Sequence, residues 1–332
     1  MTLTLEQKKI QILEKITNDF GFYSSHFLKI RTKNADIRPL IFNDAQKELE
    51  RVINLQKNST GKVRVIILKG RQQGLSTAVG AYLYHNVSTK KAKKALVVAH
   101  THKAAETLFT MTQRYHENNN APYPIKPKTK LSGKAHLVFG ELDSSYMVAT
   151  AGGDGIVRGE TITHAHLSEI AFWPEAHAEN NLNGLLQSIP NTPDTAILIE
   201  STANGVTGPF YRLWQDAVAG KNSFYPLFIP WYWQQEYRET IPDHYIFEAT
   251  PDEMELAKLY GLDNEQLYWR RLKIYETSFD KFKQEYPFTA DEAFITSGSQ
   301  IFDAEPLVKR VSELKNNRPI ARQDLILNEW VD

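Results

Sequence analysis

A short apolar run followed at once by a glycine-rich loop constrains the fold of this chain most strongly. The run "VRVIILK" (63–69) is continuous and rich in β-branched residues, which predicts a strand buried on both faces. The loop "GRQQG" comes next, and "LSTAVGAYLYHNV" (75–87) has a helical pattern. Strand, loop and helix in this order are typical of a site where backbone amides at a helix N-terminus hold a phosphate.

The loop departs from the usual phosphate-binding pattern at one position. In G-x-x-x-x-G-K-[S/T], a lysine after the last glycine reaches the β- and γ-phosphates and the hydroxyl binds magnesium. Gly74 and Ser76 stand where this pattern needs them, but Leu75 occupies the lysine position. Lys69 and Arg71, at the start of the loop, are the positively charged residues that could replace the missing lysine. The alternative is a strand-to-helix turn that happens to contain glycine.

Four further apolar runs predict strands, and helical stretches such as 101–115 lie between several of them. The runs cover 95–100, 145–151, 163–169 and 195–202. This alternation predicts an α/β fold with a mostly parallel sheet flanked by helices, and ligands at the carboxyl ends of its strands.

The two ends of the chain have other patterns. Residues 5–30 predict a polar helix followed by an aromatic-rich loop, and 36–56 predict a loop that runs into a helix capped near Asn43 or Asp44. The stretch 252–285 looks helical. We therefore expect an N-terminal segment (1–50), a core that contains the glycine-rich loop (51–235) and a further subdomain (236–332).

Composition excludes several classes of protein. Apolar residues make up 42% and charged residues 23% of the 332 residues, as in a globular chain. With no long apolar run and a polar start, we expect a cytosolic protein with no membrane partner. The absence of cysteine excludes disulfides and thiolate metal sites. The 39 basic and 39 acidic residues cancel, so any nucleic-acid surface must be a local cluster.

Two other strand ends carry polar residues. The strand ending in "HLSE" places Ser168 and Glu169 where a phosphate-loop ATPase has an acidic pair, one acid orienting magnesium and the next positioning the attacking water. Glu169 keeps the carboxylate of a general base, whereas Ser168 brings no charge. The segment "ESTANG" (200–205) has small polar groups that could sense a γ-phosphate. Taken singly, these features could be a solvated strand end and a simple turn.

The ordered set KGRQQGLST, HLSEIAFW, ESTANG and FKQEYPFTADEAFITSG resembles the ATPase half of the large terminase subunit of tailed double-stranded-DNA phages. The resemblance extends from about residue 42 to 298. Members of that family are ATP-driven motors that thread DNA through a portal into an empty capsid. The resemblance implies a P-loop NTPase fold of the additional-strand-catalytic-glutamate type, with a small, mostly helical lid or linker subdomain after the core. It also implies hydrolysis of ATP with Mg²⁺.

The resemblance also implies roles for particular residues. Some terminases carry the loop lysine at the start of the loop, the place that Lys69 holds here. On this basis Lys69 and Arg71 would contact the phosphates and Glu169 would activate water. Ser76 would bind magnesium with help from Ser168, and Thr77 is the alternative to Ser76. The implied nucleotide-binding loop is Lys69, Gly70, Arg71, Gln72, Gln73, Gly74, Leu75, Ser76 and Thr77. The implied coupling residues are Glu200, Ser201, Thr202, Asn204 and Gly205.

The resemblance implies two further roles, one at the adenine base and one at a neighbouring subunit. "FNDAQ" resembles the family's adenine-recognition element, so Gln46 would hydrogen-bond the base while Phe42 packs on it; otherwise Gln46 faces solvent. Arg158 lies in "GGDGIVRGETI" and is placed like an arginine proposed to reach the ATP of a neighbouring subunit.

The resemblance also implies partners. They are double-stranded DNA, a portal protein, a small terminase subunit and further copies of the chain in a ring, with a pentamer expected on the portal and a monomer in isolation. The chain would be encoded by a phage or prophage, act in the host cytoplasm and not remain in the mature virion. Two lysine clusters could contact DNA phosphates, although either could be only solvated loop charge. They are Lys90, Lys91, Lys93 and Lys94, and Lys126, Lys128, Lys130 and Lys134.

The chain ends at "NEWVD", before the family's nuclease domain would begin, so we expect ATP hydrolysis without DNA cleavage. His164 and His166 are interpreted as packing groups, or as groups that support the site from behind, rather than as metal ligands. Two rival functions stay open: a helicase-like DNA translocase, and a nucleotide-binding assembly module that hydrolyses ATP weakly. The replacement of the usual lysine by Leu75 and of the usual aspartate by Ser168 would favour the second rival.

Overall fold

The computed structural model describes residues 4–152 and 161–295. Contacts divide the chain into units of residues 1–297 and 298–332, and the second unit lies outside the described residues, as does Arg158. No helix among the described residues is both long and apolar enough to cross a membrane.

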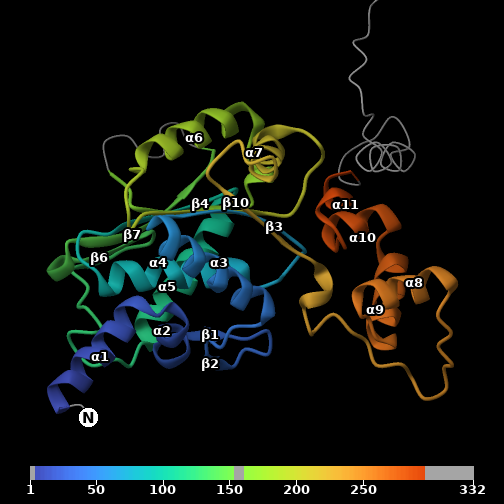
Figure 1. Ribbon diagram of the computed structural model, residues 1–332, viewed down its shortest axis with the longest axis horizontal. Coiled ribbons are helices and arrows are strands. Elements are labelled where there is room, and N and C mark those ends of the chain that lie inside the picture. The colour runs from blue at the N-terminus through green and yellow to red at the C-terminus, as the bar shows by residue number, and fades with distance from the viewer. Residues whose placement is uncertain (1–3, 153–160, 296–332) are drawn as a thin grey trace, which may run out of the picture. The chain divides into compact units, whose positions relative to one another are not determined.

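An eight-stranded mixed sheet organises the first unit (Figure 1). Its order is β10-β3-β9-β8-β4-β7-β6-β5. Pairs from β10 to β7 are parallel, and the pairs β7–β6 and β6–β5 are antiparallel. The strands are β3 (Val63–Lys69), β4 (Lys94–Ala99), β5 (Leu131–Ser132), β6 (His136–Phe139), β7 (Ser144–Thr150), β8 (His164–Ser168), β9 (Ala196–Ser201) and β10 (Tyr225–Ile229). The predicted mostly parallel sheet is confirmed, and β9 is the additional strand between β3 and β8.

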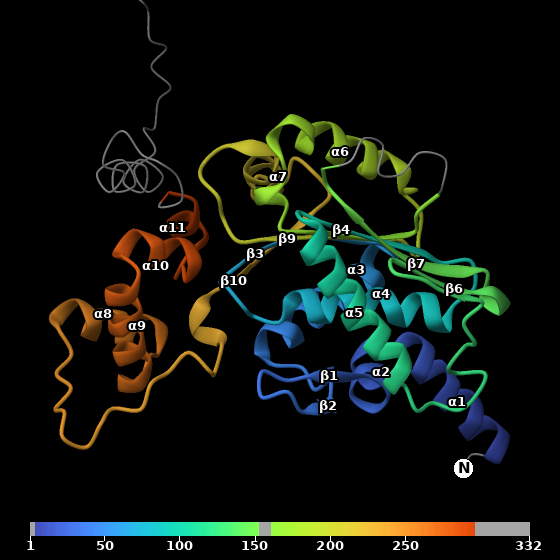
Figure 2. The same cartoon turned by 180° about the vertical axis from the view of Figure 1, so that it is seen from behind.

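Helices cover both faces of the sheet (Figures 1 and 2). On one face lie α1 (Leu5–Asn18), α2 (Phe20–Phe27), α3 (Asp44–Thr60), α4 (Leu75–Thr89) and α5 (His102–Asn118). On the other lie α6 (Glu175–Ser188) and α7 (Gly208–Val218). Each face packs on its own buried apolar cluster, so the sheet is the middle layer of three.

The central strand and helix explain why the loop between them is held firmly. All seven residues of β3 are buried, as the continuous apolar run predicts for a strand with neighbours on both sides. Helix α4 is buried almost all round, because the sheet, α2, α3 and α5 surround it. The loop of residues 70–74 therefore joins two elements that are fixed in the core.

The N-terminal region is more regular than the sequence suggested. The aromatic-rich segment predicted as a loop is helix α2, capped by the Asp19 carboxylate, and it is helical because Phe20 and Tyr23 pack into the core. The segment before α3 is also not wholly a loop, since β1 (Lys29–Arg31) pairs with β2 (Ile37–Pro39). The predicted cap of α3 is confirmed: Asn43 closes a capping box with Gln46.

A helical region follows β10, as the sequence predicted. It contains α8 (Pro251–Tyr260), α9 (Asn264–Glu276), α10 (Phe279–Glu285) and α11 (Ala290–Ile295). Short 3₁₀ helices are η1 (Gly140–Leu142), η2 (Ile170–Phe172) and η3 (Trp231–Trp233). Trp231, Leu267 and Phe282 belong to a third apolar cluster, which joins η3 to α9 and α10.

Candidate nucleotide site

The loop of residues 70–74 leads directly into α4. Gly74 is the N-cap residue with a φ of 73°, a left-handed conformation that favours glycine, and it has no side chain to cap the helix. Gly70 is needed for a different reason, since a Cβ there would lie 3.2 Å from the backbone of Trp231. The first amides of α4 are thus left without a capping side chain, as an anion site requires.

Carbonyl groups of the loop are hydrogen-bonded by residues from two directions. From α3 and its cap, Asn43 Nδ2 donates to the Gln73 carbonyl at 3.2 Å and Gln46 Nε2 donates to the Gly74 carbonyl at 2.7 Å. From the segment after η3, Gln234 Nε2 donates to the Gln72 carbonyl at 3.1 Å. These bonds fix the loop in one shape before any ligand arrives.

Lys69 ends β3 and lies between two carboxylates. Its Nζ is 2.8 Å from Glu169 Oε1 and 4.0 Å from Glu200 Oε2. Burial alone would lower the pKa of Lys69, but Glu169 and Glu200 raise it above its ordinary value, so the ammonium stays charged. The cation is therefore present at the start of the loop, paired with the predicted general base.

Glu200 is fully buried at the end of β9. Its Oε1 accepts from His166 Nε2 at 2.8 Å and from the Ser168 hydroxyl at 3.3 Å. Burial raises the pKa of Glu200, but Lys69, the hydrogen bond from His166 and one from Ser76 lower it to about 2. The carboxylate is thus ionised at neutral pH, and its Oε2 has no hydrogen bond of normal geometry.

Glu169 follows β8 with a φ of 51°, which turns its side chain toward β9. Its Oε2 accepts from the Thr202 amide at 3.2 Å and from the Ser201 hydroxyl at 3.3 Å. Asn204 donates to the Ala171 carbonyl at 3.0 Å. Three residues of the "ESTANG" segment are therefore bonded to Glu169 or to the turn that follows it. Gly205 lies in the same loop with a φ of 81°.

Arg71 points away from this cluster, toward α10. Its Nη1 is 3.0 Å from Glu285 Oε2, and its amide donates to the Glu285 carbonyl at 2.8 Å. The neighbouring Gln284 donates from Nε2 to the Ala203 carbonyl at 3.2 Å. The end of α10 thus contacts both the glycine-rich loop and the loop after β9.

The two residues expected to recognise a base lie next to the loop, but both already contact other residues of the protein. Gln46 uses both ends of its amide, accepting from the Asn43 amide at 3.1 Å and donating to Gly74. Phe42 is 9% exposed and packs on Phe20, with ring centroids 5.0 Å apart. In this structure neither side chain is turned to an open space.

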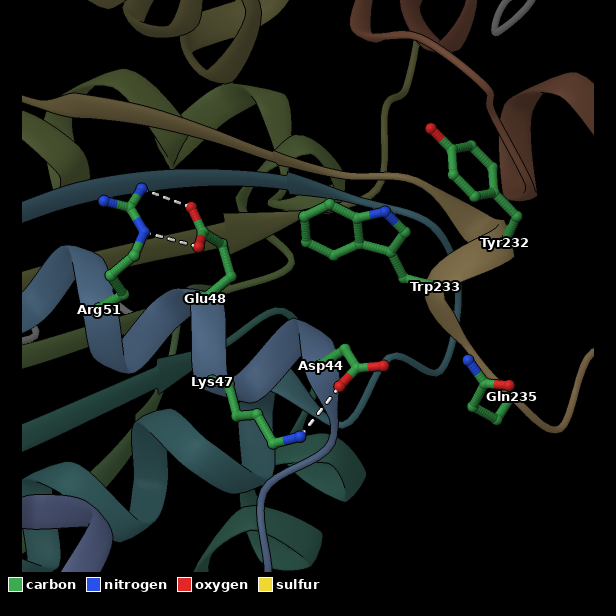
Figure 3. Close-up of a pocket in the computed structure, with 7 residues that line it drawn as sticks. All are labelled: Asp44, Lys47, Glu48, Arg51, Tyr232, Trp233 and Gln235. Carbon is green, nitrogen blue, oxygen red and sulfur yellow. Dashed lines mark hydrogen bonds and ion pairs between the residues drawn. The ribbon is translucent and has the colours of Figure 1, made fainter. Parts of the chain in front are cut away.

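An open cavity of about 430 Å³ does lie beside the loop, between α3 and the segment after β10 (Figure 3). Its lining residues are Asp44, Lys47, Glu48, Arg51, Tyr232, Trp233 and Gln235. The four charged residues form two ion pairs, Lys47–Asp44 and Arg51–Glu48. Figure 3 shows Trp233 directed toward Glu48 and Tyr232 directed away from α3. The cavity therefore combines an aromatic face with balanced charge.

The two lysine clusters differ in their partners. Lys90 and Lys93 both pair with Asp194, at 2.7 and 2.6 Å, so part of the first cluster is neutralised. In the second, Lys128 lies over the Tyr123 ring, 5.2 Å from its centroid. No carboxylate partner is recorded for this second cluster within the part of the chain that the structure describes.

Several residues of the site were not found from the sequence. His166 was interpreted as a packing group or as a group behind the site, and its bond to Glu200 agrees with the second of these, but the sequence did not identify Glu200 as its partner. Glu285 lies 214 positions after Arg71 and Trp233 follows an edge strand, so no sequence pattern links either residue to the loop.

Comparisons with known proteins agree with this fold. No family model matches the chain. The large terminase of bacteriophage HK97 is similar with a TM-score of 0.56 at 14% identity, over 82% of this chain and 53% of that protein. The large terminase ATPase domain of Thermus phage P74-26 has a TM-score of 0.48 at 15% identity, over 74% and 92% of the two chains. The large terminase of the thermophilic bacteriophage D6E, solved in complex with ADP, has a TM-score of 0.43 at 16% identity, over 57% and 46%.

The chain spans about half the length of the HK97 protein, 53%. The likeness shows that it has the P-loop-type α/β fold of a phage large terminase, and the fold expected from the resemblance is confirmed.

Proposed function

We propose that this chain is a terminase-type ATPase that hydrolyses ATP to drive double-stranded viral DNA through a portal into a procapsid. One observation carries the proposal: at the carboxyl ends of adjacent strands, Lys69, Glu169 and Glu200 converge beside a glycine-rich loop that opens a buried helix. This is where an open α/β sheet binds its ligand.

The chemistry follows from these side chains. The loop amides and the N-terminus of α4 bind the phosphates. Lys69 then breaks its ion pair with Glu169 and pairs with the negative charge of the phosphates. Glu169 is then free to take a proton from the attacking water, while Ser201 and the Thr202 amide hold its other oxygen in place. Arg71 adds charge at the phosphates once it leaves Glu285.

Magnesium fits the same place. The Ser76 hydroxyl at the start of α4, the Ser168 hydroxyl and the buried, ionised carboxylate of Glu200, whose Oε2 has no hydrogen bond of normal geometry, suit a hard cation that takes oxygen ligands. Bound there, the ion would neutralise charge on the β- and γ-phosphates. No cluster of three acidic or histidine ligands able to hold a metal by itself occurs among the described residues, so phosphate oxygens would complete the site.

The base and ribose would lie in the cavity of Figure 3. Each wall of the cavity carries a residue whose neighbour in the sequence is hydrogen-bonded to the loop. Asp44 follows the cap residue Asn43, and Trp233 precedes Gln234. Balanced charge suits the uncharged end of a nucleotide. Gln46 lies at the same end of α3 and would contact the base if its bond to Gly74 opened, with Phe42 as apolar support behind it.

Coupling to movement would pass through α10. Loss of the γ-phosphate changes the bonds of Glu169 to the 200–205 segment, and Gln284 of α10 contacts that segment at Ala203. Productive turnover would need a ring of subunits on a portal, with a small terminase subunit as a further partner and Arg158 reaching the neighbouring ATP.

Phosphate release by the purified chain with Mg²⁺-ATP, DNA and portal tests the proposal. Glu169→Ala and Lys69→Ala should each abolish turnover, because one removes the base and the other the buried cation. Arg71→Ala should reduce turnover less, since Arg71 is exposed and bound elsewhere. Lys62→Ala, which alters the lysine just before the opposite end of β3, is the matched control. Full turnover in Glu169→Ala would refute the mechanism. ATP binding with no turnover even on the portal would favour the weakly hydrolysing module instead.

A further inference from the structure

The position that usually carries a magnesium-orienting acid is a serine in this chain. Ser168 ends β8, and a hydroxyl alone is a weak partner for a divalent ion. In the parallel register of β8 and β9, however, Ser168 lies beside Glu200. The Ser168 hydroxyl donates to Glu200 Oε1 at 3.3 Å. A carboxylate is thus present one strand away from the place where the sequence lacks one.

The bonds of Glu200 favour a role as a cation ligand over a purely structural one. The residue has no exposed surface, and His166 and Ser168 both hold its Oε1. Its Oε2 lies in the site with no hydrogen bond of normal geometry. A buried carboxylate oxygen left in this way is costly unless a cation compensates it.

Lys69, the cation beside Glu200 Oε2, cannot balance the charge of Glu200 throughout the reaction cycle. Lys69 Nζ is 4.0 Å from this oxygen and 2.8 Å from Glu169. If Lys69 turns to the phosphates, both carboxylates lose its charge. Glu169 is 24% exposed and can be solvated, but Glu200 is fully buried and cannot. A second cation must then arrive with the nucleotide.

We propose that Glu200 supplies the carboxylate that Ser168 lacks, and that with Ser76 it holds the Mg²⁺ which enters with ATP. This inference rests on the proposed function and adds the identity of the metal-holding acid. Glu200 contacts the ion directly or through one of its waters, which is how an acid at a strand end orients magnesium in such sites.

Binding of Mn²⁺, which prefers the same oxygen ligands, tests the inference without any turnover. Free Mn²⁺ is measured by electron paramagnetic resonance while it is titrated into protein with saturating ADP. Glu200→Gln should weaken Mn²⁺ binding to the protein–ADP complex by about 10- to 100-fold, whereas ADP binding without metal should persist. Glu253→Gln, which alters another buried carboxylate in α8, is the matched control and should leave Mn²⁺ affinity unchanged.

A double variant that moves the carboxylate to β8 distinguishes loss of a metal ligand from general damage to the core. Ser168→Asp combined with Glu200→Gln returns the acid to β8 and should restore most of the lost Mn²⁺ affinity. If Glu200→Gln binds Mn²⁺ as the unchanged chain does, Glu200 is only a partner of Lys69 and the inference is wrong while the ATPase proposal stands. If the unchanged chain binds no ADP, both fail.

If the Glu200→Gln variant does not fold, the inference can still be tested by a measurement on the unchanged chain. Bound Mn²⁺ broadens the nuclear magnetic resonance signals of nearby nuclei. With ADP present, Mn²⁺ should broaden the ring signals of His166, which contacts Glu200, much more strongly than those of His85. His85 lies nine residues beyond Ser76 on α4, about 14 Å along the helix. Equal broadening of both histidines, or of neither, would overturn the inference.

Discussion

Lys69 shows how a phosphate loop can lack a lysine beside its serine and still have a cation. Placed at the last residue of β3, it reaches the site from the strand instead of from the helix, and Glu169 and Glu200 hold it there. The ion pair with Lys69 also balances the charge of Glu169, the general base that we propose. Because Leu75 is buried against the core, its position has become a packing position.

Trp233 should contribute to nucleotide affinity through the base alone. Stacking of a base on an aromatic ring contributes about 1–3 kcal/mol, so Trp233→Ala should weaken ATP and ADP binding by about 5- to 150-fold in calorimetry. Binding of inorganic tripolyphosphate should not change, and Trp233→Phe should retain most of the affinity. Tyr275→Ala, which alters an exposed ring on α9, serves as the control. Equal ATP affinity in Trp233→Ala would exclude the cavity as the base site.

Sequence reasoning found the individual polar residues but not their partners. Lys69, Glu169 and Glu200 could be picked out because each ends a predicted strand. Their mutual contacts depend on strand order, which no local pattern contains. For Phe42 the sequence did not indicate the contact with Phe20, because Phe20 lies in a segment that was not predicted as helical.

At the scale of elements, prediction succeeded where burial is uniform and failed where packing overrides composition. The strand β3 was predicted to the residue because every side chain in it is buried. The strand β10 went unrecognised because Pro226 interrupts its pattern, and the edge position of the strand tolerates this proline. Helix α2 was missed because tertiary contacts of its aromatic residues, rather than their helix propensity, stabilise it.

Helix α10 should transmit the state of the site to the helical region. Gln284 is buried against the Ala203 carbonyl and Lys281 Nζ holds its Oε1 at 2.8 Å, so the contact is rigid. Gln284→Ala should leave ADP affinity nearly unchanged but remove the effect of ADP on hydrogen exchange in α8, α9 and α10. Lys258→Ala, at the end of α8, is a control that should keep the response. A normal response in Gln284→Ala would place the coupling elsewhere.

At the scale of the whole molecule, buried histidines make the fold sensitive to acid. Burial lowers the pKa of His85 and of His164 to about 3 and that of His116 to about 4. In the unfolded chain these groups titrate near pH 6.5, so the unfolded state binds more protons below that pH. Stability is therefore fully present above about pH 6.5 and falls as the pH is lowered.

Each fully buried histidine should remove about 2 kcal/mol from the free energy of unfolding between about pH 6.5 and about pH 5. Urea unfolding at the two pH values measures the loss. His164→Asn should make the pH dependence shallower, whereas His102→Ala, which alters an exposed histidine, should not. An unchanged slope in His164→Asn would mean that His164 is not a source of the sensitivity.

The far edge of the sheet also limits how copies of this protein can associate. Strand β5 is two residues long, Leu131–Ser132, and pairs only through those residues with β6. Such a short edge offers another polypeptide almost no backbone to hydrogen-bond, which protects the sheet against edge-to-edge aggregation. At this edge, subunits of a ring would have to recognise one another through side chains, whose replacement can alter the assembly without disturbing the sheet.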